Sequence, residues 1–468
     1  MTSLFNKINK IYKYFLLALR GEETEFTTGS INKAIFLLSV PMVLEMVMEA
    51  LFAVVDVYFV GKVSVDAVAT VGLTESVMMM VYAIAIGLSM AATAVVSRRV
   101  GEKDYKRAGD AAFQAILIAA IFSVVISFFG IIYAEDILRL MGGSEALVSK
   151  GFGYTRVMLG GNLCIMLLFL INAIYRGAGD ASMAMRSLWI ANGLNIVLDP
   201  LFIFGWGPIP AYGVEGAAIA TTIGRSMGVF YQVFGLLSGS RIIKLGLENI
   251  NLRWKTIKRI FNIGLGGMGQ FLIESASWLF LVRIISEFGS AALAGYTIAF
   301  RIIVFTILPS WGMANAAATL VGQNLGANKP DRAEKSVWFT AHLNTAFLFA
   351  VSILFFIMAP DFVMIFTDDL VATEYGATAL RIICVGYITF AYGMVISQGF
   401  NGAGDTKTPT IMNIIFFWLV QIPLAYVLAF VFELGFKGAI SSVAVAFALH
   451  ALACIYWFRK GKWKLIEV

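Results

Sequence analysis

The sequence has little charge for its length, and very little cysteine or histidine. Of its 468 residues, 14% are charged and 59% are hydrophobic. Soluble domains carry about 25% charged and about 45–50% apolar residues, so this composition excludes an ordinary soluble protein. The three cysteines, Cys164, Cys384 and Cys454, lie far apart in apolar runs and indicate neither a disulfide framework nor a metal cluster. With only His342 and His450, the sequence also gives no sign of a histidine-rich metal site.

Long apolar runs are abundant instead. A helix of about 20 apolar residues crosses a bilayer. Twelve such runs occur, at 35–60, 67–97, 108–133, 150–175, 184–206, 213–237, 259–285, 291–322, 336–358, 377–400, 408–431 and 436–458. The sequence therefore predicts an all-α membrane protein with twelve transmembrane helices. The preceding segment 1–30 is too charged for a secretory signal and predicts a basic amphipathic helix on the inner membrane surface.

Lysine and arginine are distributed unevenly between the two sides of these helices. If the N-terminus is cytoplasmic, the outer loops carry few of them, namely Lys62, Arg139, Lys150, Arg156 and Lys437. Because basic residues concentrate in cytoplasmic loops, we expect both termini in the cytoplasm of a multi-pass protein of the cell (inner) membrane. The net charge of +6 is then loop charge near anionic lipid, and no nucleic-acid partner is expected.

One sequence pattern occurs twice. The tetrapeptide Gly-Ala-Gly-Asp begins at Gly177 and again at Gly402, 225 residues further on. At the same offset, the segment 87–101 (GLSMAATAVVSRRVG) aligns with 312–326 (GMANAAATLVGQNLG). These repeats predict one six-helix unit written twice, with the halves related by an axis along the membrane normal.

The repeat also sets the predicted domain boundaries. They are the N-terminal segment 1–30, an N-lobe 31–237, a cytoplasmic linker 238–258, a C-lobe 259–458 and a cytoplasmic tail 459–468.

Several motifs carry a family resemblance. They are VVDVYFVGKVSVDAVATVGL, GLSMAATAVVSRRVGEKD, YRGAGDA, LNIVLDPLFIFG and GVEGAAIATTIGR, in this order. With the half-length repeat, the chain resembles the MATE (multidrug and toxic compound extrusion) family. The resemblance implies two pseudo-symmetric six-helix lobes around a V-shaped central cavity. It also implies antiport, in which a cationic or amphipathic compound leaves while Na⁺ or H⁺ enters.

Acidic residues lie within the predicted spans, where an ionisable group is functional by default. In the first span, Glu45, Glu49 and Asp56 share one helical stripe. In the fifth, Asn195 and Asp199 share another, with Asn192 on the same face. For Asn192 the alternative is a purely structural hydrogen bond between helices.

Asp56, Asp199 and Thr221 are expected at one depth. Counted from the outer ends of their helices, each lies roughly 11–12 Å below the outer surface. With Asn195, these groups can supply hard oxygen ligands for Na⁺. Alternatively, two nearby carboxylates can share a proton, because like charges resist simultaneous ionisation. In similar MATE proteins, the first-lobe cation site uses an Asp of helix 1 and an Asn-x-x-x-Asp of helix 5, which Asp56, Asn195 and Asp199 match; for the hydroxyl, Thr222 is the neighbouring alternative to Thr221.

Glu274 is the acidic candidate of the second lobe. In NorM-type MATE proteins, a Glu at this place belongs to a second cation site together with an Asp of helix 10, but the span 377–400 here has no carboxylate. Glu274 therefore either faces a cationic substrate or is a structural acid bonded to Arg283 or Ser275. Glu49, its repeat mate, has the same two interpretations.

Pro41 lies near the start of the first span and removes a backbone donor there. In similar proteins a proline at this place is linked to bending of helix 1, and an ordinary kink is the alternative. The two Gly-Ala-Gly-Asp loops predict tight turns, with Asp180 and Asp405 capping the helices that follow.

The function favoured by these features is a cation-coupled antiporter that exports cationic or amphipathic drugs and toxic compounds by alternating access. The alternative is a lipid or lipid-linked saccharide flippase of the same superfamily, and a third possibility is a channel or structural membrane protein. No nucleophile–base pair indicates an enzyme. We expect no cofactor, Na⁺ or H⁺ as the coupling ion, contact with membrane lipids, and action as a monomer.

Overall fold

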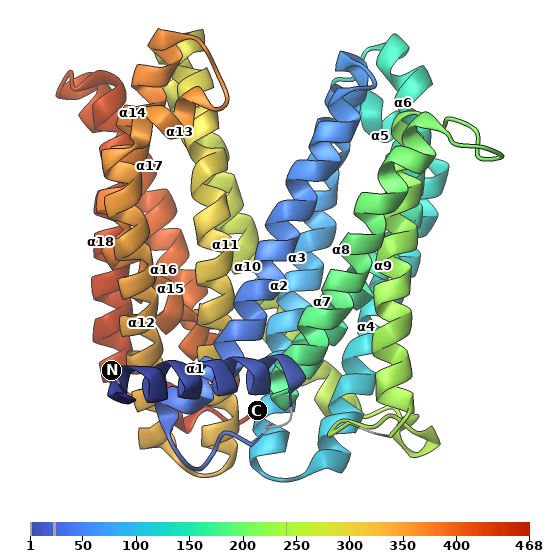
Figure 1. Cartoon of the computed structure of the whole chain (residues 1–468), viewed down its shortest axis with the longest axis vertical. Helices are drawn as coiled ribbons and strands as arrows, with labels where there is room; N and C mark the ends of the chain where they lie inside the picture. The colour runs from blue at the N-terminus through green and yellow to red at the C-terminus, as the bar shows by residue number, and fades with distance from the viewer. Residues whose placement is uncertain (1, 22–24, 240) are drawn as a thin grey trace.

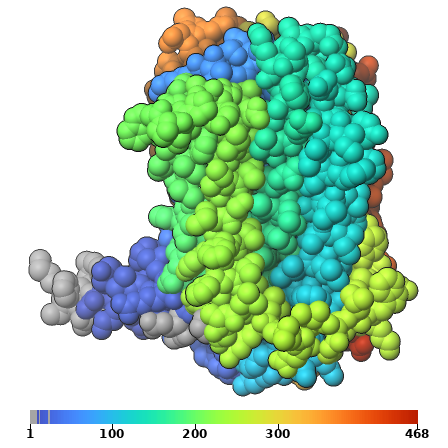
Figure 2. All heavy atoms as spheres, turned by 90° about the vertical axis from the view of Figure 1, so that its right-hand side faces the viewer, coloured from blue at the N-terminus to red at the C-terminus, as the bar shows by residue number. Residues whose placement is uncertain are grey.

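The computed structural model describes residues 2–21, 25–239 and 241–468, and these residues are almost entirely helical (Figure 1). They contain no β-strand; one isolated β-bridge joins Trp206 and Ile209. The prediction of an all-α chain is therefore confirmed. The first helix, α1 (Thr2–Arg20), lies across one end of the bundle, and Figure 2 shows it extending sideways from the base.

The first half of the chain forms one group of helices. It comprises α2 (Ile31–Gly61), α3 (Val65–Gly101), α4 (Tyr105–Ile132), α5 (Ala134–Leu140), α6 (Glu145–Gly160), α7 (Asn162–Ala178), α8 (Ala181–Phe204) and α9 (Val214–Leu237). We call this group the N-half.

The second half forms a matching group, the C-half. It comprises α10 (Trp254–Ile285), η2 (Ser286–Phe288), α11 (Ser290–Gly326), α12 (Pro330–Ile357), α13 (Ala359–Met364), α14 (Leu370–Val385), α15 (Tyr387–Ala403), α16 (Lys407–Asn413), η3 (Ile414–Gln421), α17 (Ile422–Tyr426), η4 (Val427–Val431), α18 (Gly435–Arg459) and η5 (Lys462–Leu465). The linker between the halves contains η1 (Leu247–Asn249). Because the charged first turns of α10 are helical, the linker is shorter than the predicted 238–258.

The helices have the length and composition that a bilayer requires. Among the described residues, 9 helices pass this test, and the pair α14 and α15, bent by 56°, brings the number to 10. The helices α9 and α10, with 24 and 32 residues, are less apolar and complete the predicted twelve. α9 carries the charged residues Glu215 and Arg225, and α10 begins in a basic stretch.

The two Gly-Ala-Gly-Asp loops have the same local structure. Gly179 and Gly404 end α7 and α15 in the left-handed region, at φ 91° and 89°, where glycine avoids a side-chain clash. Asp180 then accepts a hydrogen bond from the Met183 amide, and Asp405 accepts one from the Thr408 amide. The predicted turns and capping aspartates are thus present in both halves.

Each half has its own apolar core. The largest cluster of the N-half is built on α3, α4 and α7, and the largest of the C-half on α11, α14 and α18. In Figure 1 the halves diverge toward the end that carries α5, α6, α13 and α14, and converge at the end that carries α1. The two halves therefore form the arms of a V.

Glycines make the contact between the halves unusually close where they converge. An alanine Cβ at Gly101 of α3 would lie 2.0 Å from the Gln323 carbonyl oxygen of α11, and one at Gly326 would lie 2.1 Å from the Arg98 carbonyl oxygen. Small residues of this kind allow helix backbones to touch within a membrane. The final residues of the aligned repeat segments 87–101 and 312–326 thus meet at the seam between the halves.

Two end segments cross this seam in opposite directions. Residues 25–29, which precede α2 of the N-half, bind the C-half: the Phe26 amide donates to Gln323 Oε1 at 3.3 Å, and Lys329 Nζ donates to the Thr27 carbonyl at 2.8 Å. Residues 466–468, which follow the C-half, receive hydrogen bonds from Arg98 and Arg99 of α3. Each half is therefore held by a segment that belongs to the other.

Candidate functional site

The predicted cation site of the N-half is partly assembled by direct hydrogen bonds. Asn195 and Asp199 lie on α8 and Thr221 on α9, and all three side chains are buried. Asn195 Nδ2 donates to Asp199 Oδ1 at 3.2 Å and to Thr221 Oγ1 at 3.0 Å. Thr222 instead donates to the Ala218 carbonyl of its own helix. Of the two adjacent threonines, Thr221 is the one that faces this cluster.

Two oxygen atoms of this cluster have no partner among the described residues. Asn195 Oδ1 and Asp199 Oδ2 are both buried without a hydrogen bond. Buried acceptors without donors are costly, and a small cation or a proton would satisfy them. No three His, Cys, Asp or Glu side chains of the described chain converge as a metal site, so Na⁺ would depend on amide, hydroxyl and main-chain oxygens as well.

Asp56 of α2 is the remaining member of the predicted cation site. It forms no hydrogen bond with the other members. It lies within electrostatic reach of Asp199, and also of Glu75 on α3. None of these three acids forms an ion pair with a lysine or arginine of the described residues. The N-half therefore holds three carboxyl groups without an ion-pair partner among the described residues, one each on α2, α3 and α8.

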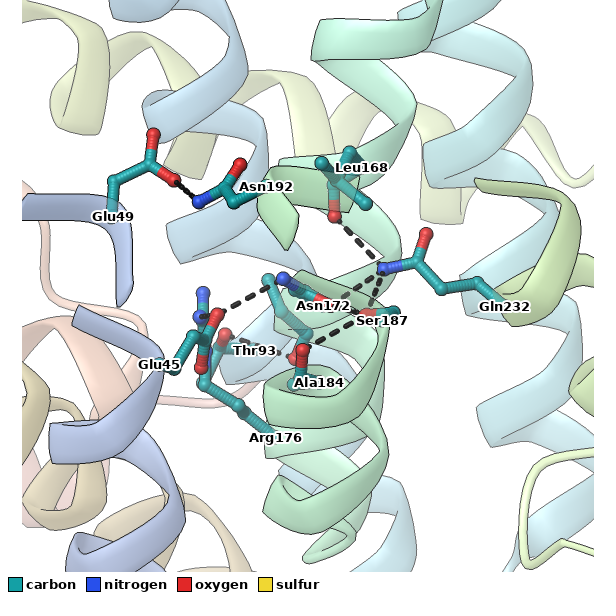
Figure 3. A network of polar contacts seen from close by, with 11 residues as sticks. Glu45, Glu49, Thr93, Leu168, Asn172, Arg176, Ala184, Ser187, Asn192 and Gln232 are labelled. Carbon is teal, nitrogen blue, oxygen red and sulfur yellow. Dashed lines mark hydrogen bonds and ion pairs between the residues drawn. The ribbon is translucent and has the colours of Figure 1, made fainter. Parts of the chain in front are cut away.

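Glu49 of α2 is paired rather than free. Its Oε1 accepts from Arg225 Nη2 at 2.9 Å, and its Oε2 accepts from Asn192 Nδ2 at 2.8 Å. Figure 3 shows the Glu49–Asn192 hydrogen bond. Asn192 thus forms a hydrogen bond between α8 and α2, and the acceptor is the acidic group of Glu49.

A second acid–arginine pair involves Glu45, one helical turn before Glu49 on α2 (Figure 3). Glu45 Oε1 accepts from Arg176 Nη1 at 2.7 Å and from Asn172 Nδ2 at 2.9 Å. Asn172 Oδ1 in turn accepts from Ser187 and from Gln232. This network ties α2, α7, α8 and α9 together.

A cavity separates the two halves beside these pairs. It has a volume of about 220 Å³, and its walls include Glu49, Arg176 and Phe169 of the N-half and Trp311 and Gln398 of the C-half. A cavity lined by aromatic and aliphatic side chains with a few convergent polar groups is typical of small-molecule sites. The paired acid Glu49 is therefore part of a surface that a ligand can reach.

Glu274 of α10 faces a neighbouring cavity of about 290 Å³, which lies mainly within the C-half. Gln270, Trp278 and His450 line it as well. The Glu274 carboxylate has no hydrogen bond or ion pair among the described residues, and Arg283 instead pairs with Glu287. The structure therefore contains no bond from the Glu274 carboxylate to Arg283 or Ser275, and the carboxylate is available to contact a ligand.

Pro41 is buried within α2, which is continuous from Ile31 to Gly61. Its neighbour Met42 lies against Gly312 of α11, where an added Cβ would lie 2.5 Å from the Met42 carbonyl oxygen. The point at which α2 lacks a backbone donor is therefore also a point of contact between the halves.

Three charged residues of this region were not singled out from the sequence: Glu75, Arg176 and Arg225. Each is a charged residue within or at the end of a predicted span, which is by itself a functional signal. The signal was available for Glu75 and Arg225, whereas Arg176 stands next to a loop and resembles an ordinary basic loop residue.

The chain is similar to known export proteins along almost all of its length. A probable multidrug resistance protein NorM of Thermotoga maritima is 27% identical over 440 residues, which cover 93% of each chain. The multidrug export protein MepA of Staphylococcus aureus is 23% identical over 436 residues, which cover 92% of this chain and 94% of that protein.

Solved structures of the same kind superimpose closely. One shows the outward-facing conformation of a multidrug resistance MATE family transporter; it has a TM-score of 0.88 and 28% identity, and covers 94% of this chain and 98% of that one. A MOP superfamily transporter from Pyrococcus furiosus has a TM-score of 0.87 and 27% identity, covering 95% and 97%. The MatE family model matches residues 41–201 and 268–427, one stretch in each half. The chain is therefore a member of the MatE family, the MATE transporters, with its twelve helices in two lobes.

Proposed function

We propose that this transporter exports cationic or amphipathic compounds across the cell membrane by alternating access, in exchange for Na⁺ or H⁺. The relatives named as multidrug resistance and export proteins support the cargo class. The orientation that we propose places α1 and both termini in the cytoplasm, in agreement with the positive-inside rule. The structure would then represent a state in which the cytoplasmic ends of the halves are closed.

The observation that carries this proposal is that Asp56, Glu75 and Asp199 have no ion-pair partner among the described residues. An ionised carboxylate within a membrane is unfavourable without a compensating cation. Asp199 Oδ2 and Asn195 Oδ1 are buried acceptors without a donor. Binding of Na⁺ or a proton at this cluster would compensate for the missing donors. Cation binding at such a site is favourable, and alternating access would let the cation enter from outside and leave to the inside.

The walls of the two cavities support a cationic rather than an anionic cargo. Together they include the acids Glu49 and Glu274, and Arg176 is the one arginine or lysine among their lining residues. A flippase that carries a lipid-linked pyrophosphate requires a cluster of basic groups. The alternative of a lipid-linked saccharide flippase is therefore less well supported.

Efflux from proteoliposomes tests the proposal. The purified protein is reconstituted, loaded with ethidium, and exposed separately to an imposed Na⁺ gradient and an imposed H⁺ gradient. We expect one of these gradients to accelerate ethidium transport, and dissipation of that gradient to abolish the acceleration. Transport that responds to neither gradient would contradict the cation-coupled mechanism.

A further inference from the structure

Arg225 is a buried arginine that uses only part of its hydrogen-bonding capacity. It lies on α9, is 3% exposed, and donates from Nη2 to Glu49. Its guanidinium carbon lies 5.1 Å from the ring centroid of Phe52 and 5.5 Å from that of Phe169, so the two rings flank the charge. Nη1 is buried and has no hydrogen-bond partner among the described residues.

Arg225 lies within reach of several acids that differ in their surroundings. It bonds to Glu49, which lines the central cavity together with Phe169. Asp56 and Glu75 lie within electrostatic reach of the guanidinium, although neither bonds to it. Arg225 is therefore close both to the acid that a cargo can touch and to acids that have no ion-pair partner among the described residues.

We propose that Arg225 is a tethered cation whose exchange between Glu49 and the acids Asp56 and Glu75 makes cargo binding and driving-cation binding mutually exclusive. This inference rests on the proposed antiport and assigns its coupling to one side chain. When a cationic cargo binds Glu49, it displaces the guanidinium, and the unused Nη1 turns toward Asp56 and Glu75. The added positive charge there disfavours a second cation.

The reverse step follows from the reciprocity of linked binding equilibria. A cation bound among Asp56, Glu75 and Asp199 repels the guanidinium, which then remains on Glu49 and excludes the cargo. In the structure Arg225 pairs with Glu49, as this second arrangement requires of the guanidinium. A single tethered charge thus makes the binding of cargo and driving cation mutually exclusive, as antiport requires, although the two ligands do not contact each other.

The other acid–arginine pair does not have the geometry for this exchange. In Glu45–Arg176 the roles are reversed, because the acid is 1% exposed and the arginine side chain, at 11%, lines the cavity. Asn172 also holds Glu45 Oε1, as part of the network in Figure 3. In Glu49–Arg225 the acid side chain is 19% exposed and the arginine 4%, so it is the acid that a cationic cargo can reach.

Ethidium binding to the purified full-length protein tests the inference. Fluorescence anisotropy gives the ethidium Kd in nanodiscs at pH 8, with Na⁺ or choline as the salt cation, and again over a series of proton concentrations. We expect the driving cation to weaken ethidium binding to the wild-type protein. In Arg225→Gln, we expect about tenfold tighter binding in the absence of the driving cation, which corresponds to about 1.4 kcal/mol, and no competition.

Two further variants separate charge from structure. Arg225→Lys keeps the tethered charge and should retain the competition. Arg253→Gln removes the exposed partner of the buried Asp110 at the linker, far from the cavity, and serves as the matched control with wild-type Kd and competition. Arg225→Gln with the competition of the wild type, or Arg225→Lys without any, would overturn the inference.

Removal of one partner from a buried ion pair can prevent folding. The double variant Glu49→Gln/Arg225→Gln removes both charges, and its ethidium binding should be independent of the driving cation. Competition that persists in this folded double variant also overturns the inference. Wild-type efflux that ignores both gradients overturns the proposed function, whereas normal wild-type exchange with competition intact in Arg225→Gln overturns the role of Arg225 alone.

Discussion

A single methyl group at the seam between the halves should shift the conformational equilibrium of the transporter. Gly326 ends α11 and lies against the backbone of α3, so its replacement by alanine inserts a Cβ between two helices that belong to different halves. The obstructing atoms are backbone atoms, which cannot rotate away. Gly326→Ala should therefore act as a wedge that favours the state in which these ends are apart.

The size of the effect follows from the geometry. The new Cβ would lie 2.1 Å from the Arg98 carbonyl oxygen, whereas ordinary contact begins at 3.4 Å, so α3 and α11 must separate by about 1.3 Å. Overpacking of this kind costs about 1–3 kcal/mol, which corresponds to a shift of about 5–150-fold in the equilibrium. The helix preference of alanine over glycine, about 1 kcal/mol, affects both states and cancels.

Distance measurements between spin labels detect the shift. Lys106 near the start of α4 and Lys335 near the start of α12 are exposed on different halves at the converging ends, and both are replaced by labelled cysteine after removal of Cys164, Cys384 and Cys454. Gly326→Ala should increase the population with a long Lys106–Lys335 distance.

Gly72→Ala is the matched control, because Gly72 lies in α3 and an added Cβ meets nothing within 4 Å. Its distance distribution should equal that of the parent protein. A Gly326→Ala distribution indistinguishable from both would refute the reasoning that backbone contact at this seam holds the ends together.

Three further predictions concern the polar residues. Asp56→Asn and Asp199→Asn should each abolish gradient-driven ethidium efflux from proteoliposomes while the protein still inserts and elutes as a single species; wild-type efflux by either variant would remove that acid from the coupling site. Glu274→Gln should weaken ethidium binding more than binding of a neutral dye, and equal weakening of both would indicate a structural role. Asn172→Ala should lower the free energy of unfolding by about 1–3 kcal/mol, measured as a lower midpoint of thermal unfolding in detergent, because it removes the acceptor that Ser187 and Gln232 share and a donor to the buried Glu45.

Sequence patterns were sufficient to predict the architecture, because the length and hydropathy of each apolar run determine whether that run spans a membrane. Apolar runs identified the twelve spans, and the 225-residue repeat identified the two lobes. The repeat even predicted that Asp180 and Asp405 play the same capping role, since identical loops after identical helices meet the same steric limits. Helix ends were less predictable, as α10 shows: its charged first turns lie outside the apolar run but remain hydrogen-bonded as helix.

The pairing of charges was beyond the reach of sequence reasoning. Stripes on one helix follow from 100° per residue, and they correctly placed Asn195 and Asp199 together. Whether Glu49 meets a cargo or Arg225 depends on the tilt and rotation of α2 relative to α9, which no single-helix pattern contains. The choice between Thr221 and Thr222 has the same origin, because adjacent residues point in directions about 100° apart and only packing determines which one faces Asn195.

The two end segments that cross the seam resemble the exchanged arms of two subunits. Residues 25–29 and 466–468 each bind the opposite half, as in a domain-swapped dimer whose protomers have been fused into one chain. Association of the halves then depends less on the covalent connection through the linker than on this exchange. A chain divided in the linker, between Gly246 and Leu247, should therefore reassemble from two co-expressed fragments, and removal of residues 466–468 should weaken that reassembly.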